Sequence, residues 1–124
     1  MNSSIGSKIW VYPDGYLPGG VDDDLGASGQ AVCILNPNEK EAKVKISIYY
    51  NNKESLQSCT IASNPKTVKH YRLDDPNALP GITVPEQNPF GVVLKSDNPI
   101  VAQMTLVDTR GSNLGWFSTI GYNE

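Results

Sequence analysis

Prolines and glycines divide the sequence into short segments, and this spacing constrains the fold more than any other feature. The 124 residues include nine prolines and eleven glycines, and the segments between them are rich in Val, Ile, Thr and Tyr. β-Branched and aromatic residues favour strands, whereas Pro and Gly mark turns. No segment shows the sustained apolar stripe of a helix. Short strands separated by frequent turns are typical of an all-β sandwich or barrel.

The clearest strand runs from Ala42 to Tyr50. Apolar Val44, Ile46 and Ile48 alternate there with polar residues such as Lys45, which is the pattern of a strand with one buried face. The same reasoning gives the other expected strands: Lys8–Tyr12, Gln30–Leu35, Gln57–Ala62, Thr67–Leu73, Gly91–Ser96, Ile100–Val107 and Trp116–Tyr122.

Turn residues and long polar stretches predict the connections. Asp97-Asn98-Pro99 has the turn chemistry of a tight hairpin between two expected strands. Pro13–Gly29 and Asp74–Pro89 are longer than usual connections, and such loops are commonly functional or cover the ends of a sandwich. We therefore predict one domain over residues 1–124, an antiparallel β-sandwich of about eight strands.

Charge and cysteine content limit the partners and the compartment. The net charge is −3, with ten basic and thirteen acidic residues spread along the chain, so the footprint of a nucleic-acid binder is lacking. We expect a cytoplasmic protein, because no signal peptide pattern opens the sequence and no apolar run reaches the ~20 residues of a membrane span. Cys33 and Cys59 lie in apolar strand-like segments, where we expect buried free thiols.

The residue types needed for catalysis or metal binding are poorly arranged. His70 is the single histidine and no Gly-x-Ser-x-Gly motif occurs, so a nucleophilic triad is not supported. One histidine and two distant cysteines do not supply the four ligands of a zinc site. Asp22-Asp23-Asp24 lacks the spacing of a calcium loop. We expect no enzyme activity, no metal and no cofactor.

Two groups of residues suggest a ligand site. Trp10 and Tyr16 flank Asp14 near the first expected loop, and aromatic faces beside a carboxylate suit sugars or other flat polar ligands. Asp108 and Arg110 leave the strand Ile100–Val107 as either a ligand-contacting pair or a salt-bridged strand end. Strand ends and loops gather at the edges of a sandwich, so the two groups can meet. The predicted ligand-binding residues are Trp10, Asp14, Tyr16, Asp108 and Arg110.

An alternative function rests on basic residues. Lys43, Lys45, Lys66, Lys69 and Arg72 lie on or near two expected strands, which could form a local basic face despite the acidic total. Such a face would suit a transcriptional regulator that contacts DNA phosphates.

An ordered series of segments runs through nearly the whole chain: Ser4-Ile5-Gly6, Trp10, Asp14-Gly15-Tyr16-Leu17-Pro18, Ala31-Val32-Cys33-Ile34-Leu35-Asn36, Ile46-Ser47-Ile48-Tyr49-Tyr50, Thr67-Val68-Lys69-His70, Asn98-Pro99-Ile100-Val101, Asp108-Thr109-Arg110 and Ser118-Thr119-Ile120-Gly121-Tyr122. Together these segments resemble the sensory rhodopsin transducer family. The resemblance implies a β-sandwich without enzymatic activity that assembles into a homotetramer and binds small molecules such as sugars. One branch of the family couples to a membrane photoreceptor.

The sequence departs from the family pattern at three positions. Met104 and Leu106 stand where the pattern carries His and Arg, and Asp14 stands where it carries Glu. The loss of two cations weakens the case for photoreceptor coupling and for an anionic ligand. We therefore expect a non-catalytic ligand-binding or signal-transducing module for a polar molecule such as a sugar, and DNA contact through the basic strands stays the alternative. Exposed sheet edges offer surface for subunit contacts.

Overall fold

The computed structural model describes residues 4–17, 21–22, 26–27, 29–51, 56–75, 77–85, 88–108, 115–119 and 121–124, and the side chains of these residues except 21–29 and 107–119. None of these residues is helical, so this part of the chain has no helix able to cross a membrane. The strands are β1 (Ser7–Tyr16), β2 (Val21–Asp22), β3 (Gly26–Ala27), β4 (Gly29–Asn36), β5 (Ala42–Tyr50), β6 (Gln57–Ser63), β7 (Thr67–Arg72), β8 (Pro89–Asp108), β9 (Gly115–Thr119) and β10 (Tyr122–Asn123).

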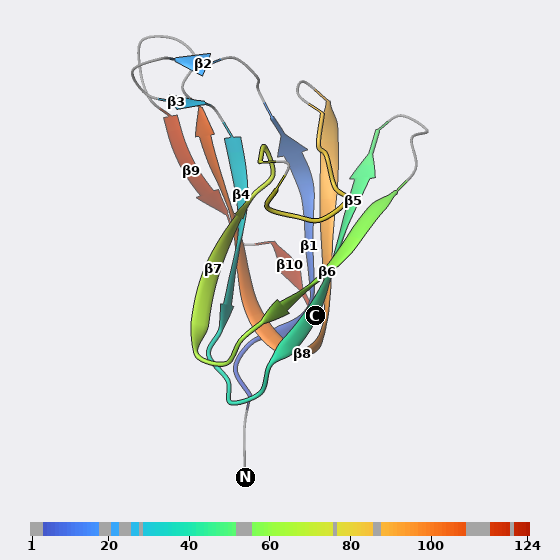
Figure 1. Cartoon of the computed structure of the whole chain (residues 1–124), viewed down its shortest axis with the longest axis vertical. Coiled ribbons are helices and arrows are strands. Elements are labelled where there is room, and N and C mark those ends of the chain that lie inside the picture. Colours follow the sequence, from blue (N-terminus) through green and yellow to red (C-terminus); the bar gives the residue numbers. More distant parts are fainter. Residues whose placement is uncertain are drawn as a thin grey trace.

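Eight strands form one continuous antiparallel sheet that folds over into two layers (Figure 1). The first layer, called here the first sheet, has the order β10-β1-β8-β5-β6. The second sheet has the order β9-β8-β4-β7. β2 and β3 pair with each other separately. The all-β sandwich predicted from the spacing of strands and turns is confirmed.

β8 belongs to both layers, and here the predicted hairpin is wrong. The sequence suggested that the chain reverses at Asp97-Asn98-Pro99, but β8 continues through these residues for 20 residues in total. Its first half pairs with β1 and β5, and its second half pairs with β4 and β9. The three residues therefore form a bend at which the strand changes sheet, as occurs at the corners of other sandwiches.

Side chains at the bend bond to a neighbouring segment, and this explains why the chain bends and does not reverse. The Lys43 N–H donates to Oδ1 of Asp97 at 2.8 Å, and Nδ2 of Asn98 donates to the carbonyl oxygen of Glu41 at 2.9 Å. These bonds tie the corner to the start of β5. The Asx chemistry that usually closes a hairpin turn is used here to hold a corner.

The core lies between the two sheets and includes a segment that the sequence had suggested was only a loop. Val44, Ile46 and Ile48 of β5 are fully buried, as their alternation predicted. Leu79 and Ile82, between β7 and β8, are also buried, with 2% and 3% of their surface exposed. Burial of an aliphatic side chain of this size contributes about 1.5–3 kcal/mol, so this connection is part of the core.

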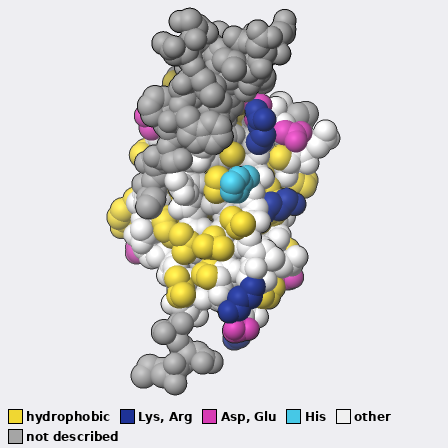
Figure 2. Space-filling model, turned by 90° about the vertical axis from the view of Figure 1, so that its left-hand side faces the viewer, with side chains coloured by type: hydrophobic (Ala, Val, Ile, Leu, Met, Phe, Trp, Pro, Cys, Tyr) yellow, Lys and Arg dark blue, Asp and Glu magenta, His cyan; other side chains and the backbone are white. Residues whose placement is uncertain are grey.

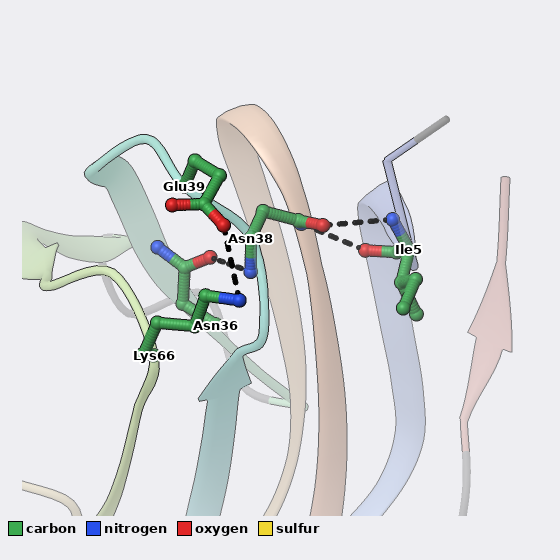
Figure 3. Close-up of polar contacts among 5 residues, drawn as sticks. All are labelled: Ile5, Asn36, Asn38, Glu39 and Lys66. Atoms are coloured by element: carbon green, nitrogen blue, oxygen red, sulfur yellow. Dashed lines mark hydrogen bonds and ion pairs between the residues drawn. The ribbon is translucent and has the colours of Figure 1, made fainter. Parts of the chain in front are cut away.

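A polar cluster fixes the turn between β4 and β5 (Figure 3). Asn38 exchanges two hydrogen bonds with the backbone of Ile5, both at 2.9 Å, and its backbone N–H donates to Oδ1 of Asn36. The ion pair between Lys66 and Glu39 lies beside them at 3.1 Å, with both side chains exposed. An exposed pair contributes about 0–1 kcal/mol, so the asparagines hold this end of the sandwich.

The cysteines and the first predicted loop differ in detail from expectation. Cys33 and Cys59 are free, as predicted, but both are half-buried and not fully buried.

β1 extends to Tyr16 and therefore occupies the first residues of the predicted loop Pro13–Gly29.

Candidate functional site

The candidate site begins at an irregularity in β1. Tyr12 pairs with Val92 and Gly15 pairs with Phe90, so two residues of β1, Pro13 and Asp14, oppose the single residue between their partners. Such a bulge changes the direction in which side chains point and is common near binding sites. Both Pro13 and Asp14 are exposed.

Gly15 is the first paired residue after the bulge, and the close packing at this position requires a residue without a side chain. A Cβ atom at Gly15 would lie 2.3 Å from the Phe90 ring, which is buried with 3% of its surface exposed. The Phe90 ring therefore occupies the space that a side chain at Gly15 would fill. This contact fixes the backbone that presents Asp14.

A hollow of about 300 Å³ lies beside the bulge, and we call it the Asp14 hollow. Gly91 lies on β8 between the bulge and Tyr49 of β5, because Tyr49 is the cross-strand partner of Gly91. The missing side chain of Gly91 leaves room between the carboxylate and the phenol ring. The lining residues are Pro13, Asp14, Tyr49, Tyr50, Asn51, Pro89, Phe90 and Gly91.

Of the two tyrosines in the Asp14 hollow, Tyr50 is held by a hydrogen bond and Tyr49 is exposed to solvent. The Tyr50 hydroxyl donates to Oε1 of Gln57 at 2.7 Å, and burial raises the pKa of Tyr50, so the phenol stays neutral. Tyr49 is 49% exposed. An open ring next to a carboxylate can cover the apolar face of a ligand while the carboxylate accepts hydrogen bonds from its hydroxyl groups.

Tyr49 was not among the predicted site residues, although the sequence contains a signal for it. It occupies a polar position in the alternation of Ala42–Tyr50 and must therefore lie on the outer face of the sheet. A large aromatic side chain at such a position leaves apolar surface open to solvent, which is informative when other groups converge on it.

Of the predicted aromatic residues, Trp10 belongs to the core and Tyr16 lies at a strand end. Trp10 is 5% exposed, and its indole N–H lies 3.1 Å from the Ser7 carbonyl oxygen and 3.2 Å from that of Ile100. These contacts are structural, and Trp10 does not line the Asp14 hollow. Tyr16 is 39% exposed, and its backbone N–H donates to Oε1 of Gln30 at 2.9 Å.

The predicted pair Asp108 and Arg110 is described only in part. Asp108 is the last residue of β8, but its side chain and the whole of Arg110 lie outside the described residues. The ends of β1 and β8 lie at the same end of the sandwich (Figure 1). Gln30, which bonds to the end of β1, is the cross-strand partner of Leu106. The two predicted groups thus share one end, and their joint site stays a prediction.

A second hollow, of about 400 Å³, lies on the outer face of the second sheet. Figure 2 shows apolar side chains around His70 on this face. The pairing of β7, β4 and β8 places Val68, Leu35 and Val101 in one row across the sheet. The lining contains no carboxylate, so it lacks the aromatic and acidic character of the Asp14 hollow. Its lining residues are Cys33, Leu35, Val68, His70, Val101, Ala102, Gln103 and Thr105.

The basic residues proposed for DNA contact do not share one face. Lys43 and Lys45 lie on β5 in the first sheet, whereas Lys69 and Arg72 lie on β7 in the second sheet. Lys66 and Arg72 are each ion-paired with a carboxylate, at 3.1 and 2.8 Å. The structure therefore gives the DNA-binding alternative no continuous basic surface on the described residues. Across the same residues, no three His, Cys, Asp or Glu side chains gather as a metal site.

Comparison with known proteins finds the same fold and a sequence family. Residues 5–123 match the family described as Anabaena sensory rhodopsin transducer. The crystal structure of Thermotoga maritima 1070 is similar, with a TM-score of 0.84 and 27% identity over 96% of each chain. The Anabaena sensory rhodopsin transducer is similar, with a TM-score of 0.71 and 33% identity over 88% of this chain and 96% of that chain. No curated protein matches the sequence.

Proposed function

Because this chain belongs to the Anabaena sensory rhodopsin transducer family, we propose that it is a non-catalytic module that binds a small polar ligand and relays a signal. The name of the similar structure, a sensory rhodopsin transducer, supports the relay. The proposal places the protein in the cytoplasm as a homotetramer, with a membrane photoreceptor or another sensor as its partner.

The observation that carries the ligand proposal is the position of Tyr49 opposite Asp14 across Gly91. Asn51 adds an amide that can both donate and accept hydrogen bonds. A carboxylate in the hollow and a net charge of −3 disfavour an anionic ligand. The proposed ligand is therefore a neutral polyhydroxylated molecule such as a sugar.

The relay proposal follows from the path of β8. Gly91 forms part of the hollow in the first half of β8, and the same strand continues into the second sheet. A ligand that orders the backbone at Gly91 would act on a strand shared by both sheets. A continuous, packed element is the kind of physical connection that coupling between two surfaces requires.

Replacement of Tyr49 by alanine is expected to weaken ligand binding about tenfold, which corresponds to about 1.4 kcal/mol. The ring is half exposed and anchors no part of the core, so the fold should remain intact. Isothermal titration calorimetry against a panel of neutral mono- and disaccharides measures the change. Val68→Ala is the matched control, since Val68 is 61% exposed on the other sheet.

A second pair of variants determines where the ligand lies. Gly91→Val would fill the Asp14 hollow: its Cβ atom would lie 3.4 Å from the Tyr12 carbonyl oxygen, which is an ordinary contact. Asp108→Asn combined with Arg110→Met tests the predicted strand-end pair. We expect Gly91→Val to abolish binding. If Gly91→Val binds normally and the double variant does not, the site lies at the end of β8 and the assignment to the Asp14 hollow is wrong.

A further inference from the structure

Lys45 of β5 and Lys95 of β8 are direct cross-strand partners in the first sheet, and we call them the lysine pair. Val44, Ile46 and Leu94, which are their neighbours along the strands, are buried in the core. The alternation of a strand therefore places both lysines on the outer face, where both are exposed. The Cβ atoms of directly opposed residues lie about 4.5–5.5 Å apart, so the two ammonium groups share one small area of this face.

This arrangement is unfavourable for folding, and the neighbouring strands do not relieve it. Like charges directly opposite each other destabilise a sheet. The second cross-strand partner of Lys45 is Thr60, and that of Lys95 is Ile9, neither of which carries a charge. Within the part of the chain that the structure describes, neither lysine forms an ion pair. A local conflict without a compensating contact is expected where residues serve a function.

Other basic side chains show that the fold supplies partners elsewhere. Lys66 and Arg72 are each paired with a carboxylate, at 3.1 and 2.8 Å. The Lys69 ammonium lies 5.2 Å from the centre of the Tyr71 ring, a cation–π contact. The lysine pair differs from these residues because its charges are left for a group outside the chain to neutralise.

A third positive charge extends the patch along β5. Lys43 precedes Lys45 by two residues, lies on the same face and is exposed. A rise of about 3.4 Å per residue places the two Cα atoms about 7 Å apart. Side chains at alternate positions of any extended chain have this spacing. Carboxylates at positions i and i+2 of an extended segment therefore match the row formed by Lys43 and the lysine pair.

Carboxylates at both ends of the patch restrict the partner to a narrow one. Asp97 accepts a hydrogen bond from the backbone N–H of Lys43 at 2.8 Å, so its carboxylate lies at one end. Asp14 is exposed at the other end, beside Tyr49 of the same strand. These carboxylates and the net charge of −3 disfavour a broad anionic surface such as a bilayer or a DNA duplex. A short acidic segment that lies between them avoids this repulsion.

We infer that the lysine pair and Lys43 form a docking site for a short, extended acidic segment of a partner protein, with carboxylates at alternating positions. One carboxylate lies between the two ammonium groups of the lysine pair, and the next contacts Lys43. All three charges are exposed, so the association is reversible and weakens as salt rises. The docking site does not use the groups of the Asp14 hollow, and it therefore goes beyond the proposed binding of a polar ligand.

A synthetic peptide with glutamate at alternating positions tests the docking site, and the same peptide with glutamine is its control. The titration is followed by NMR of the backbone amides at about 10 mM salt, where the Debye length is about 30 Å. Saturable shifts around the lysine pair are expected with the glutamate peptide alone. Equal shifts with both peptides, or tighter binding of duplex DNA or anionic vesicles at the same lysines, would overturn the inference.

Lys45→Glu separates docking from folding. It replaces two like charges with two opposite charges across the strands, so the urea midpoint should rise while the affinity for the glutamate peptide falls about tenfold or more. Lys69→Glu changes the net charge by the same amount on the second sheet and should leave the peptide affinity unchanged. Equal affinities of the two variants would contradict the assignment to the lysine pair.

Lys45→Glu combined with Lys95→Glu reverses the sign of the lysine pair and keeps two like charges opposite each other. This double variant should prefer a peptide with lysine at alternating positions, a gain that a damaged fold cannot produce. A double variant that binds neither peptide, or still prefers the glutamate peptide, would show that these two charges do not select the partner. Sugar titrations report on the Asp14 hollow separately, so the two proposals can fail independently.

Discussion

Replacing Asn36 with aspartate is expected to lower the free energy of unfolding by about 3–5 kcal/mol. The Asn36 side chain is fully buried. Its Nδ2 donates to the carbonyl oxygens of Lys40 and Ser63 at 2.8 and 3.0 Å, and its Oδ1 accepts from the Asn38 N–H at 3.1 Å. Aspartate keeps the acceptor but replaces the donor with an oxygen facing two carbonyls, so two bonds are lost and a charge is buried.

The loss of unfolding free energy in Asn36→Asp should depend on pH. Burial and the facing carbonyls raise the pKa of the introduced carboxyl above the value of about 3.9 that it has in the unfolded chain. A raised pKa in the folded state means that the protonated form is favoured there, so the penalty is smallest below pH ~4 and grows as pH rises through the folded-state pKa. Urea unfolding at pH 4 and pH 7.5 measures both effects.

Asn64→Asp is the matched control for this variant. Asn64→Asp is the same chemical change at an exposed position, so we expect the free energy of unfolding to change by less than about 0.5 kcal/mol. A similar small change in Asn36→Asp at pH 7.5 would mean that this end of the sandwich rearranges to satisfy the two carbonyl groups in another way.

The local sequence pattern was sufficient to predict those strands in which one face is buried and the other is exposed. The bounds of β5 agree with the prediction because Val44, Ile46 and Ile48 alternate with polar residues along its whole length. The sandwich class followed from the number of such strands and from the turn residues between them. Both signals arise from interactions close in sequence, which is why one sequence sufficed.

Features that depend on distant partners were not predictable in the same way. Asp97-Asn98-Pro99 has hairpin chemistry, but the choice between a hairpin and a corner is made by the side-chain bonds to Lys43 and Glu41, some 54 and 57 residues away in sequence. Leu79 was assigned to a loop because prolines surround it, although it packs between the sheets. In both cases tertiary contacts outweigh the local preference.

The residues of the candidate site show the same dependence on contacts between segments that are distant in sequence. Asp14 was identified because its neighbours are aromatic, and the structure places it in a hollow. Trp10 was assigned to the same group by proximity in sequence, but Trp10 is buried in the core, whereas the bulge at Pro13 and Asp14 leaves Asp14 exposed. Tyr49 reaches Asp14 only through the pairing of β5 with β8. Sequence distance is a poor guide to which aromatic side chain faces a given carboxylate in a sheet.

Replacing Gly6 with alanine is expected to destabilise the protein by about 2–4 kcal/mol. Two separate penalties apply. The φ angle of Gly6 is +108°, which a side chain disfavours, and a Cβ atom there would lie 2.1 Å from the Ile100 carbonyl oxygen. That oxygen lies just after the bend in β8 and already accepts the Trp10 indole N–H at 3.2 Å. The strand cannot move away without disturbing the corner that joins the two sheets.

Gly81→Ala separates the two penalties. Gly81 also has a positive φ angle, +75°, but a Cβ atom there would meet nothing within 4 Å. Gly81→Ala should therefore lower the free energy of unfolding only by the penalty for the positive φ angle, about 1 kcal/mol. The difference between the two variants, measured as the shift in urea midpoint at constant slope, gives the energy of the clash with β8. Equal losses would show that the Ile100 carbonyl moves aside freely, and that the corner of β8 is not the rigid joint between the sheets that the relay through Gly91 requires.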